Sequence, residues 1–515
     1  MKLVIFHHHL NPGGVTRVVE NHLRSLGENS AEERPTAVLL VHGGRAQDWN
    51  QQELEASLPF QLDIATVEGL DYDLTGAEAS QALGSRIEKL LTDKGFTADE
   101  TLLHWHNHSL GKNASVPLAI SYLAQAGYRL LLQVHDFAED FRPGNYRYLV
   151  RKLGKDDAKQ LPKLLYPQSS NIHYATLNGR DRGVLSEAGV DESRLHFLPN
   201  PVARPPLHDH REEARELVNQ KLAIPEENRL ITYPVRGIRR KNLGETLLWA
   251  ALCDQASFLV TLAPQNPKER SSFDRWASLS AELNLPCTLG VSSSAEIPFG
   301  HLLAASDYLL TTSVAEGFGM TFLECWLVGK ELLGRNLPEI TSDFKDVGLD
   351  LSQLYDALQV PTAWLDRGQF LSEMSSLLAE TYSGFGVAPF TPQELQTQLA
   401  AMFDAETIDF ALLPSSLQES VIRRAATEAS SRERLQKLNS QVAIPEDTDS
   451  ERVATNAAAT AGEFSIEKLG QQLYSTYEAV LSSPTTAAVS GLSKGDSILT
   501  AFLQTERMNA VRVES

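Results

Sequence analysis

The sequence has few cysteines and lacks long apolar runs, and each absence excludes a class of protein. Its three cysteines, Cys253, Cys287 and Cys325, lie 34 and 38 residues apart, which fits neither a disulfide framework nor the close spacing of a zinc site. No stretch of about 18 apolar residues occurs, so no membrane-spanning helix is predicted. The opening run Leu3–Phe6 ends at His7 and is too short for a signal peptide. We therefore expect a cytoplasmic protein.

Positive charge is also scarce, which bears on the choice of partner. The chain has 46 Lys and Arg against 66 Asp and Glu, a formal net charge of −20. This acidity disfavours nucleic acid and anionic membrane surfaces as main partners. A small anionic substrate is not excluded, because one local basic site can oppose the overall sign. The stretch 101–182 has 11 Lys and Arg against 6 Asp and Glu, and it is either a solvated basic surface or a region that attracts an anionic acceptor.

Short apolar runs alternate with helix-like segments along much of the chain. Leu3–Phe6 predicts a buried strand, Asn11–Gly14 has turn composition, and apolar residues then recur at helical spacing as far as Gly27. Further strands are predicted at 37–41, 101–103, 130–134, 196–198, 230–233, 258–262 and 308–310. Alternating strands and helices predict an α/β fold with parallel sheets and helices on both faces.

Composition suggests how the chain divides into domains. Four prolines between Pro199 and Pro206 predict a linker between two α/β domains. The parts that we predict are, in order, a first domain at 1–200, a second at 207–365, a mostly helical insertion at 366–462 with a flexible Ala/Thr-rich segment at 439–462, a helix at 464–481 and an extension of unknown role at 482–515.

The strongest candidate site is the run from Ser313 to Glu324, which follows a predicted strand and leads into a predicted helix. Gly317 and Gly319 in its loop let the backbone approach a ligand closely. A loop that ends at a helix N-terminus offers free N–H groups to an anion. Glu316 and Glu324 are acceptors only, so they suit sugar or ribose hydroxyls. The alternative is an ordinary strand–loop–helix turn with surface glutamates.

A second candidate is the basic run at 236–241, which also follows a strand and opens a helix. Arg236, Arg239, Arg240 and Lys241 place four cations in six residues. Arg can bind two phosphate oxygens at once and Lys acts as a point charge, so the run suits a phosphate or diphosphate. Burying all four cations would be costly, and we expect one or two to face a site. A solvated basic turn is the alternative.

Two weaker candidates lie at strand ends in the first domain. The turn Asn11–Gly14 follows the first strand, at the carboxyl edge where open α/β sheets bind ligands. It lacks the G-x-G-x-x-G pattern of a dinucleotide site. His135 follows the strand at 130–134, although a single histidine at such a position is more often structural than ligand-binding.

The histidine-rich runs raise the question of a metal. On a strand, His104, His106 and His108 would share one face, which suggests a zinc or iron site. No carboxylate or cysteine accompanies them in the sequence. We therefore predict no metal site and expect these histidines to line an acceptor site.

Together these elements resemble the retaining nucleotide-sugar glycosyltransferases of glycosyltransferase family 4, which have the GT-B fold. The most specific match is Glu316–Glu324, which has the E-x7-E spacing of the family with Gly-Phe-Gly after the first Glu. Arg236 and Lys241 keep the five-residue interval of its diphosphate-binding loop. Asn242 stands where a glycine is common.

The resemblance covers most of residues 1–365 and the helix at 464–481. Gly13–Val15 matches the N-terminal glycine-rich loop of the family, and His135–Asp136 matches its strand-end histidine. Gly334–Glu339 departs from the usual Asp-Gly-Gly turn, and 366–462 has no clear counterpart. The resemblance implies two Rossmann-like, doubly wound domains facing across a cleft, with a mostly helical C-terminal extension whose helix at 464–481 packs back on the first domain.

The resemblance also implies residue roles. The sugar nucleotide binds mainly to the second domain, where Arg236 and Lys241 stabilise the charge on the leaving diphosphate and Glu324 holds the ribose. The implied donor-binding residues are Gly14, Arg236, Lys241, Glu316, Gly317, Phe318, Gly319, Met320, Thr321 and Glu324. The implied catalytic residues are Arg236, Lys241, His135 and Glu316. Front-face attack needs no protein nucleophile, cofactor or metal.

The acceptor is less defined than the donor. We expect a small, soluble, sugar-like acceptor that can be anionic, bound by Asn11, Gly13, His106, Arg142 and Tyr146. Two alternative functions remain on the same fold, namely a phosphorylase that cleaves a disaccharide with inorganic phosphate and a non-catalytic nucleotide-sugar-binding protein. Phosphate-dependent release of sugar 1-phosphate would indicate the former, and tight binding without turnover the latter.

Overall fold

A computed structural model describes residues 1–73, 79–388, 390–485, 488–504 and 507–513. The chain divides into two compact units. Unit 1 comprises Met1–Pro201, Gly384–Gly386 and Gly462–Gln504, and unit 2 comprises Val202–Ser383, Val387–Ala461 and Thr505–Ser515. Each unit has its own parallel sheet.

Unit 1 is built on a seven-stranded parallel sheet in the order β3-β2-β1-β4-β5-β7-β8. Its central strands are buried and rich in apolar residues, as expected for a sheet covered on both faces. The strands are β1 (Lys2–Phe6), β2 (Ala37–His42), β3 (Leu62–Thr66), β4 (Thr101–His106), β5 (Arg129–Val134), β7 (Ile172–Thr176) and β8 (Leu195–Phe197).

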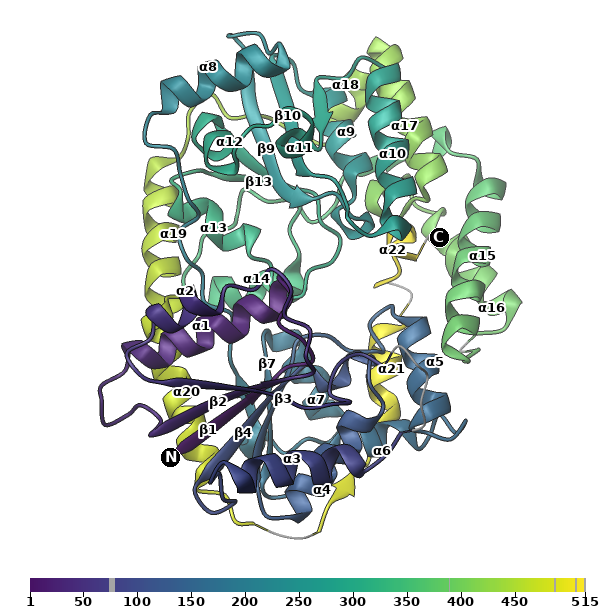
Figure 1. Ribbon diagram of the computed structural model, residues 1–515. Helices are drawn as coiled ribbons and strands as arrows, with labels where there is room; N and C mark the ends of the chain where they lie inside the picture. The colour runs from purple at the N-terminus through teal and green to yellow at the C-terminus, as the bar shows by residue number, and fades with distance from the viewer. Residues whose placement is uncertain (74–78, 389, 486–487, 505–506, 514–515) are drawn as a thin grey trace. The chain divides into compact units, whose positions relative to one another are not determined.

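Helices cover both faces of this sheet (Figure 1). α1 (Gly14–Glu28) and α20 (Ile466–Leu481) pack together over one face, and α3 (Ala82–Asp93) and α4 (Ser115–Gln125) lie over the other. The remaining helices of unit 1 are α2 (Gln51–Ala56), α5 (Pro143–Lys152), α6 (Leu161–Leu165), α7 (Gly179–Glu187) and α21 (Asp496–Phe502), with short 3-10 turns at His108–Leu110 and Glu192–Arg194.

The contact between α1 and α20 brings distant parts of the sequence into one core. Leu473, Tyr477 and Val480 of α20 join apolar residues of α1 and β1 in a single buried cluster. The helices approach so closely that a Cβ at Gly470 would lie 2.3 Å from the carbonyl oxygen of Ser25. Asn29 Nδ2 also donates to the Gly470 carbonyl at 3.0 Å. A glycine is therefore required where the two backbones meet.

Residues after α20 continue along unit 1. β16 (Ser490–Gly491) pairs antiparallel with β6 (Pro167–Gln168), and the ring of Phe502 in α21 lies 5.1 Å from that of Phe137. Residues 486–487, 505–506 and 514–515 of the predicted extension at 482–515 lie outside the described residues.

Unit 2 contains a five-stranded parallel sheet in the order β11-β10-β9-β12-β13. Val202–Leu207, which includes two prolines of the proline-rich segment, has no helix or strand and leads into α8. The strands are β9 (Arg229–Arg236), β10 (Ala256–Leu262), β11 (Cys287–Leu289), β12 (Tyr308–Thr311) and β13 (Leu332–Gly334).

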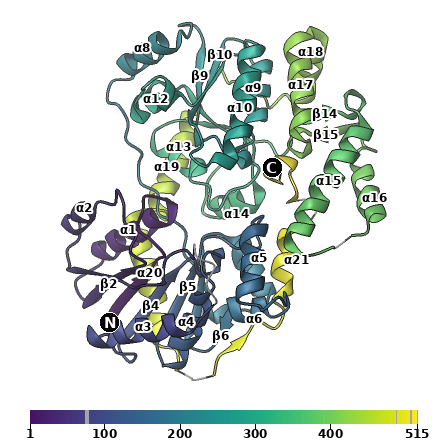
Figure 2. The ribbon, with the colours of Figure 1, turned by 45° about the vertical axis from the view of Figure 1, so that its right-hand side comes forward.

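Helices flank the second sheet as well (Figure 2). α8 (Arg211–Leu222) and α12 (Phe299–Ala305) cover one face with a core of their own, while α9 (Leu243–Leu252), α10 (Pro267–Glu282) and α17 (Ser415–Thr427) pack together on the other. The shorter helices near the sheet are α11 (Val291–Ser294), α13 (Thr321–Leu327) and α14 (Pro338–Asp346). No helix in the described ranges is long and apolar enough to cross a membrane.

The segment at 366–462 is helical, and most of it belongs to unit 2. Its helices are α15 (Arg367–Phe385), α16 (Pro392–Met402), α17, α18 (Ala429–Leu438) and α19 (Ser450–Glu463). β14 (Gln359–Pro361), which precedes it, pairs antiparallel with β15 (Thr407–Asp409) inside it. The chain ends in the short helix α22 (Ala510–Val513).

Within the segment at 439–462, which the sequence predicts to be flexible, the structure has a regular helix from Ser450 onward, α19. Polar contacts anchor this helix. Asn456 exchanges two hydrogen bonds of 2.8 Å with the backbone of Asp350, and Arg452 pairs with Glu331 at 2.6 Å. An Ala/Thr-rich helix that is held by polar contacts has little apolar periodicity, so its pattern in the sequence is weak.

Candidate functional site

The strand order defines one switch point in each unit. In unit 1 the chain passes from β1 through β2 to β3 and then resumes on the other side of β1 with β4. In unit 2 it passes from β9 through β10 to β11 and then resumes beside β9 with β12. Open α/β sheets bind ligands outside the carboxyl ends of the strands at such points. The loops that follow β1, β4, β9 and β12 are therefore the places to examine.

The loop after β9 holds the predicted basic run. Arg236 ends the strand, and its Nη1 donates to the Ala263 carbonyl at 3.1 Å. Arg239 pairs with Glu269, which also accepts the backbone N–H of Arg239 at 2.8 Å. Lys241 is buried, with 8% of its surface exposed. The next residue, Asn242, has a φ of 47°, a left-handed conformation that favours Gly or Asn.

Lys241 and Glu316 form a buried ion pair across the switch point of unit 2. Ser313 Oγ donates to Glu316 Oε1 at 2.7 Å, and Arg240 approaches Glu316 at 3.7 Å. Burial alone would raise the pKa of Glu316, but Lys241 and Arg240 outweigh it and lower the pKa below its usual value. Glu316 is therefore ionised, and its ion pair with Lys241 links the loop after β12 to the loop after β9.

The second carboxylate of the E-x7-E run acts on the same lysine. Glu324 lies in the first turn of α13 and is half-buried. Burial lowers the pKa of Lys241, and Glu316 and Glu324 both oppose this by stabilising the ammonium. Gly319, in the loop between them, has a φ of +89°, which an L side chain rarely adopts. The structure thus gathers the two predicted carboxylates and Lys241 at one edge of the sheet.

Two further residues complete this cluster, and neither was given a role in the sequence analysis, although Ser313 opens the candidate run. Ser313 lies between Glu316 and Tyr233, whose hydroxyl is 2.5 Å from Ser313 Oγ. Tyr233 is buried in β9. Their position at the ends of neighbouring strands is the signal that could have identified them, but side-chain pairing across strands cannot be read from a single sequence.

The structure also accounts for the unusual turn at Gly334–Glu339. Arg335 is a buried guanidinium that contacts Glu245 through Nε and Nη2 at 2.7–3.1 Å and Asp409 through Nη1 and Nη2 at 2.8–2.9 Å. Tyr355 donates to Glu245 Oε1 at 2.7 Å. Arg335 therefore links α9 and β15 to the turn after β13. Its Nε, Nη1 and Nη2 all donate to protein oxygens, so the guanidinium is not available to a ligand.

The loop after β1 forms the start of α1. Gly13 and Gly14 are exposed, and Gly13 precedes the helix in an extended conformation. The carbonyl of Asn11 accepts from Thr16 Oγ1 at 2.8 Å, and its Oδ1 accepts the backbone N–H of Gln47 at 2.9 Å. The amide oxygen of Asn11 thus shapes the loop, while the glycine backbone remains accessible.

His135 follows β5 and faces another histidine. Its Nε2 lies 2.9 Å from Nδ1 of His106, the last residue of β4. Burial lowers the pKa of His135 to about 4, so the ring is neutral at pH 7. His106, which we expected to bind the acceptor, has no exposed surface. His106 can influence a substrate only through His135.

Arg142 and Tyr146 are held by neighbours within unit 1. Arg142 Nη2 pairs with Asp136 at 2.6 Å and is partly exposed. Tyr146 is buried, and its ring lies 5.4 Å from that of Phe385. Beside them, Arg147 and Arg151 of α5 line a pocket of about 500 Å³ together with Phe385 and neighbouring residues. Neither Arg147 nor Arg151 has an ion-pair partner among the described residues.

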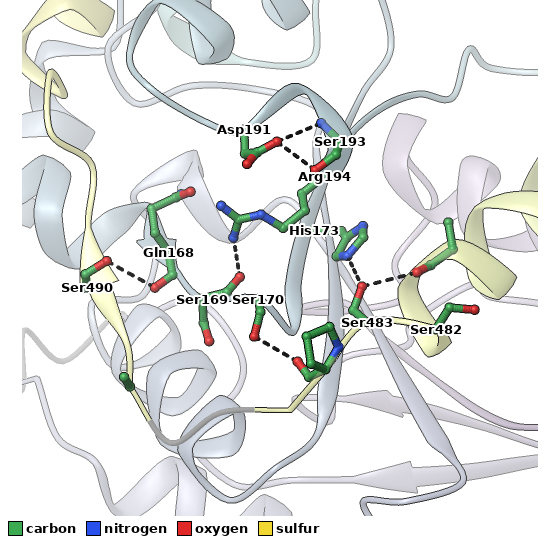
Figure 3. Close-up of a pocket in the computed structure, with 13 residues that line it drawn as sticks. Gln168, Ser169, Ser170, His173, Asp191, Ser193, Arg194, Ser482, Ser483 and Ser490 are labelled. Carbon is green, nitrogen blue, oxygen red and sulfur yellow. Dashed lines mark hydrogen bonds between the residues drawn. The ribbon is translucent and has the colours of Figure 1, made fainter.

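A second pocket of about 630 Å³ lies at the amino-terminal ends of two strands of the same sheet (Figure 3). It is formed by segments that precede β7 and β8, where Arg194 Nη1 donates to the Ser169 carbonyl. His173 lies 2.6 Å from Ser483 Oγ and 2.8 Å from His196. None of the predicted site residues lines this pocket.

Comparison with known proteins supports the fold and adds a relative. No family model matches the sequence. The chain is 28% identical over 427 residues to mannosylglucosyl-3-phosphoglycerate synthase of Petrotoga mobilis, covering 81% of this chain and 80% of that protein. It matches the structure of Anabaena Alr3699/HepE in complex with UDP and glucose with a TM-score of 0.50 and 13% identity, over 93% of this chain and 99% of that one.

A second structure of the same Anabaena protein, in complex with UDP, matches with a TM-score of 0.51 and 12% identity, over 93% of this chain and 100% of that one. The fold is therefore that of the GT-B glycosyltransferases, with a Rossmann-like sheet in each unit and a helical C-terminal region. This confirms the fold class predicted from the sequence.

Proposed function

We propose that the chain is a retaining glycosyltransferase of family 4 that moves a sugar from a nucleoside-diphosphate sugar to an acceptor hydroxyl in the cytoplasm. The observation that carries the proposal is the cluster of Lys241, Glu316 and Glu324 at the switch point of unit 2, with Arg236 at the end of β9 before the same loop. It combines cations suited to a diphosphate with carboxylates suited to hydroxyls.

In this proposal, Arg236 and Lys241 stabilise the charge that develops on the leaving diphosphate. A preorganised cation in a buried site is effective because it needs no reorganisation during the reaction. Glu316 and Ser313 hold Lys241 in place before the donor binds. Glu316 and the Gly317–Gly319 backbone then bind the donor sugar, and Glu324 binds the ribose. These cations supply the charge that a metal ion would otherwise supply, so the reaction is expected to need no metal.

Unit 1 contributes neutral groups to the proposal. His135 is uncharged at pH 7 and offers a hydrogen bond and its backbone carbonyl to the donor sugar. The exposed backbone of Gly14 offers an N–H group. Retention of configuration follows from front-face attack, in which a phosphate oxygen of the donor accepts the proton of the acceptor hydroxyl. No protein nucleophile is involved.

The sequence relative suggests the substrates. Its name describes a product in which a mannosyl-glucosyl unit is joined to 3-phosphoglycerate. We therefore infer a mannosyl donor and an acceptor of the glucosyl-phosphoglycerate class, with both phosphate and carboxylate groups. Arg147 and Arg151, which have no ion-pair partner among the described residues, lie one helical turn apart on α5 and line one pocket together with Asp156. The two guanidinium groups suit such an acceptor.

A donor screen tests the proposal. The protein is incubated with GDP-mannose, GDP-glucose, UDP-glucose and ADP-glucose, and binding is measured by calorimetry. Glucosyl-3-phosphoglycerate is then added, and the product and its anomeric configuration are determined by mass spectrometry and NMR. We expect one donor to bind and one retained glycoside to form in the presence of EDTA. Failure to bind any of the nucleotide sugars would rule the proposal out.

The acceptor is tested by removing the two arginines. R147A/R151A should raise KM for glucosyl-3-phosphoglycerate by about 100- to 200-fold, since two charge-assisted contacts of about 1.5 kcal/mol each are lost. KM for the donor should stay unchanged. The matched control is K89A/K94A, which removes two exposed cations from the other end of unit 1. Equal effects of the two double variants would show a general charge effect instead of an acceptor site.

A further inference from the structure

Three histidines of unit 1 meet inside the protein. His22 comes from α1, and His104 and His106 come from β4; one ring nitrogen of each lies within 4.8 Å of the corresponding nitrogens of the other two. Each of the three residues has no exposed surface. We call this group the histidine cluster.

The arrangement follows from the periods of strand and helix. Residues two apart on β4 point to the same face of the sheet, so His104 and His106 share a face and their rings stack at 4.3 Å. α1 covers this face. His22 extends from the buried side of α1 and places its ring 5.4 Å from that of His104 and 5.2 Å from that of His106.

The polar atoms of the cluster are not fully paired. Neither ring nitrogen of His22 has a hydrogen-bond partner among the described residues, and neither has Nε2 of His106. Buried polar atoms without partners are rare in folded proteins because each loses its bonds to water. Three such nitrogens in one fully buried place are therefore available to a bound ion or an ordered water.

The remaining contacts identify where lone pairs are available. The carbonyl Oε1 of Gln133 can only accept, so Nε2 of His104, at 2.9 Å, donates to it. Nδ1 of His104 then carries a lone pair, which accepts from the Tyr477 hydroxyl at 2.8 Å. Nδ1 of His106 can donate to Nε2 of His135 at 2.9 Å, which leaves the lone pair of His106 on its unpaired Nε2.

We propose that His22, His104 and His106 bind a divalent first-row transition metal, with Zn²⁺ as the first candidate. Three neutral imidazoles suit Zn²⁺, Co²⁺, Ni²⁺ or Cu²⁺ and not Mg²⁺ or Ca²⁺, which need oxygen ligands. To bind the metal, Nδ1 of His104 gives up the hydrogen bond that it accepts from the Tyr477 hydroxyl. Gln133 and His135 then accept N–H groups from His104 and His106, the outer contacts that orient metal-bound imidazoles.

The charge state of the histidines agrees with this geometry. Burial lowers the pKa of His104 to about 3 and lowers those of His22 and His106 well below the usual value. All three rings are therefore neutral at pH 7, the form that binds a metal.

The metal would connect α1 to β4 inside unit 1, so its expected role is structural. All three ligands belong to unit 1, and the metal takes no part in the charge stabilisation that we propose for the cluster of unit 2. Metal on Nε2 of His106 also keeps the proton of His106 on Nδ1, where it donates to His135. A consequence for catalysis through His135 depends on the proposed function. The metal site itself does not depend on it.

The test uses the full-length protein and measures metal directly. Protein is expressed with and without added Zn²⁺, and metal content is measured by plasma mass spectrometry. A second sample is stripped with a chelator and incubated with Co²⁺, whose visible absorption reports the number of nitrogen ligands. The variant is H22Q, and the control is H196Q, which changes a histidine of unit 1 that stacks on His173 outside the cluster.

We expect the wild type and H196Q to hold one ion per chain and to melt at a higher temperature with metal than without. H22Q should bind at least about 100-fold more weakly and show no thermal shift with Zn²⁺. The proposal fails if stripped wild type takes up no more metal than H22Q, which would leave trapped water as the partner of these nitrogens. It also fails if H22Q keeps its metal.

A second variant protects the test against misfolding. H106Q removes a different ligand and should lose metal as H22Q does. If both variants unfold, the Co²⁺ spectrum and the thermal shift of the wild type decide alone. A spectrum without three-nitrogen coordination overturns the proposal.

Discussion

The two units share one plan but differ in the groups that they bury. Unit 2 buries charges in pairs, as in Lys241 with Glu316 and Arg335 with Glu245. Unit 1 contains such a pair, Arg180 with Asp181, but it also buries groups that are neutral, as in the low-pKa imidazole of His104 and the raised-pKa carboxyl of Glu139. Both units are nevertheless built on a parallel sheet with one switch point.

The difference follows from what each buried group can contact. A buried charge is expensive unless an opposite charge and hydrogen bonds satisfy it. Unit 2 supplies such partners from neighbouring strand ends, so its cations remain charged and available for a diphosphate. In unit 1 no carboxylate opposes the desolvation of His22, His104 or His106 among the described residues, so burial keeps these rings neutral. A shared fold therefore supports two kinds of chemistry.

The largest expected effect comes from removing the cation of the candidate site. K241A should lower kcat/KM for the transfer reaction by about 10²- to 10³-fold, because the leaving diphosphate loses a preorganised positive group. Steady-state kinetics with the donor found by screening measure it, and circular dichroism confirms folding.

The matched control for K241A lies in the same basic run. Arg239 is already paired with Glu269, so R239A should change kcat/KM by less than about fivefold, the kinetic equivalent of about 1 kcal/mol. If R239A were as damaging as K241A, the run would act as a diffuse basic patch and the paired-charge description of unit 2 would be wrong.

The next effect concerns stability in unit 2. R335M should lower the free energy of unfolding by about 3–5 kcal/mol, because Glu245 and Asp409 lose their common partner and Glu245 stays buried. Urea unfolding followed by fluorescence measures the change. R423M is the control, since Arg423 pairs with Glu282 at the surface and its loss should cost about 0–1 kcal/mol. Similar losses for both variants would contradict the assignment of Arg335 as a buried structural charge.

The sequence was sufficient to predict the parallel sheets and the two candidate loops of unit 2. β1, β9 and β12 are buried apolar runs followed by turn residues. Because this pattern is local in the sequence, it can be recognised without knowing the tertiary structure. The Lys241–Glu316 contact was not predicted, because the two residues are 75 positions apart and meet only when β9 pairs with β12.

Other features could not be predicted because they depend on long-range packing. His22 looks like one polar residue on an amphipathic helix, and only the placement of α1 over β4 brings it to His104. Arg335 looks like an exposed loop residue, and only the pairing of β14 with β15 brings Asp409 to it. α19 lacks an apolar stripe and is held by polar contacts instead.

The smallest expected effect sharpens the description of unit 1. Glu139 is buried, and its Oε2 accepts from the Tyr166 hydroxyl at 3.0 Å. Burial raises its pKa to about 7, with a smaller contribution from Asp140. The folded state thus favours the protonated carboxyl. The stability that this group contributes is fully present below about pH 4.5 and is lost as pH rises through about 7.

E139Q should therefore be more stable than the wild type above pH 7, by about 2–3 kcal/mol, and nearly equal to it at pH 4.5. The amide oxygen keeps the bond from Tyr166, while no charge can form. Urea unfolding across this pH range measures the difference. E68Q, which changes an exposed carboxylate of unit 1, should alter stability by less than about 0.5 kcal/mol at either pH. A gap between E139Q and the wild type that does not grow with pH would mean that unit 1 accommodates a buried charge as readily as unit 2, and the contrast between the units would fail.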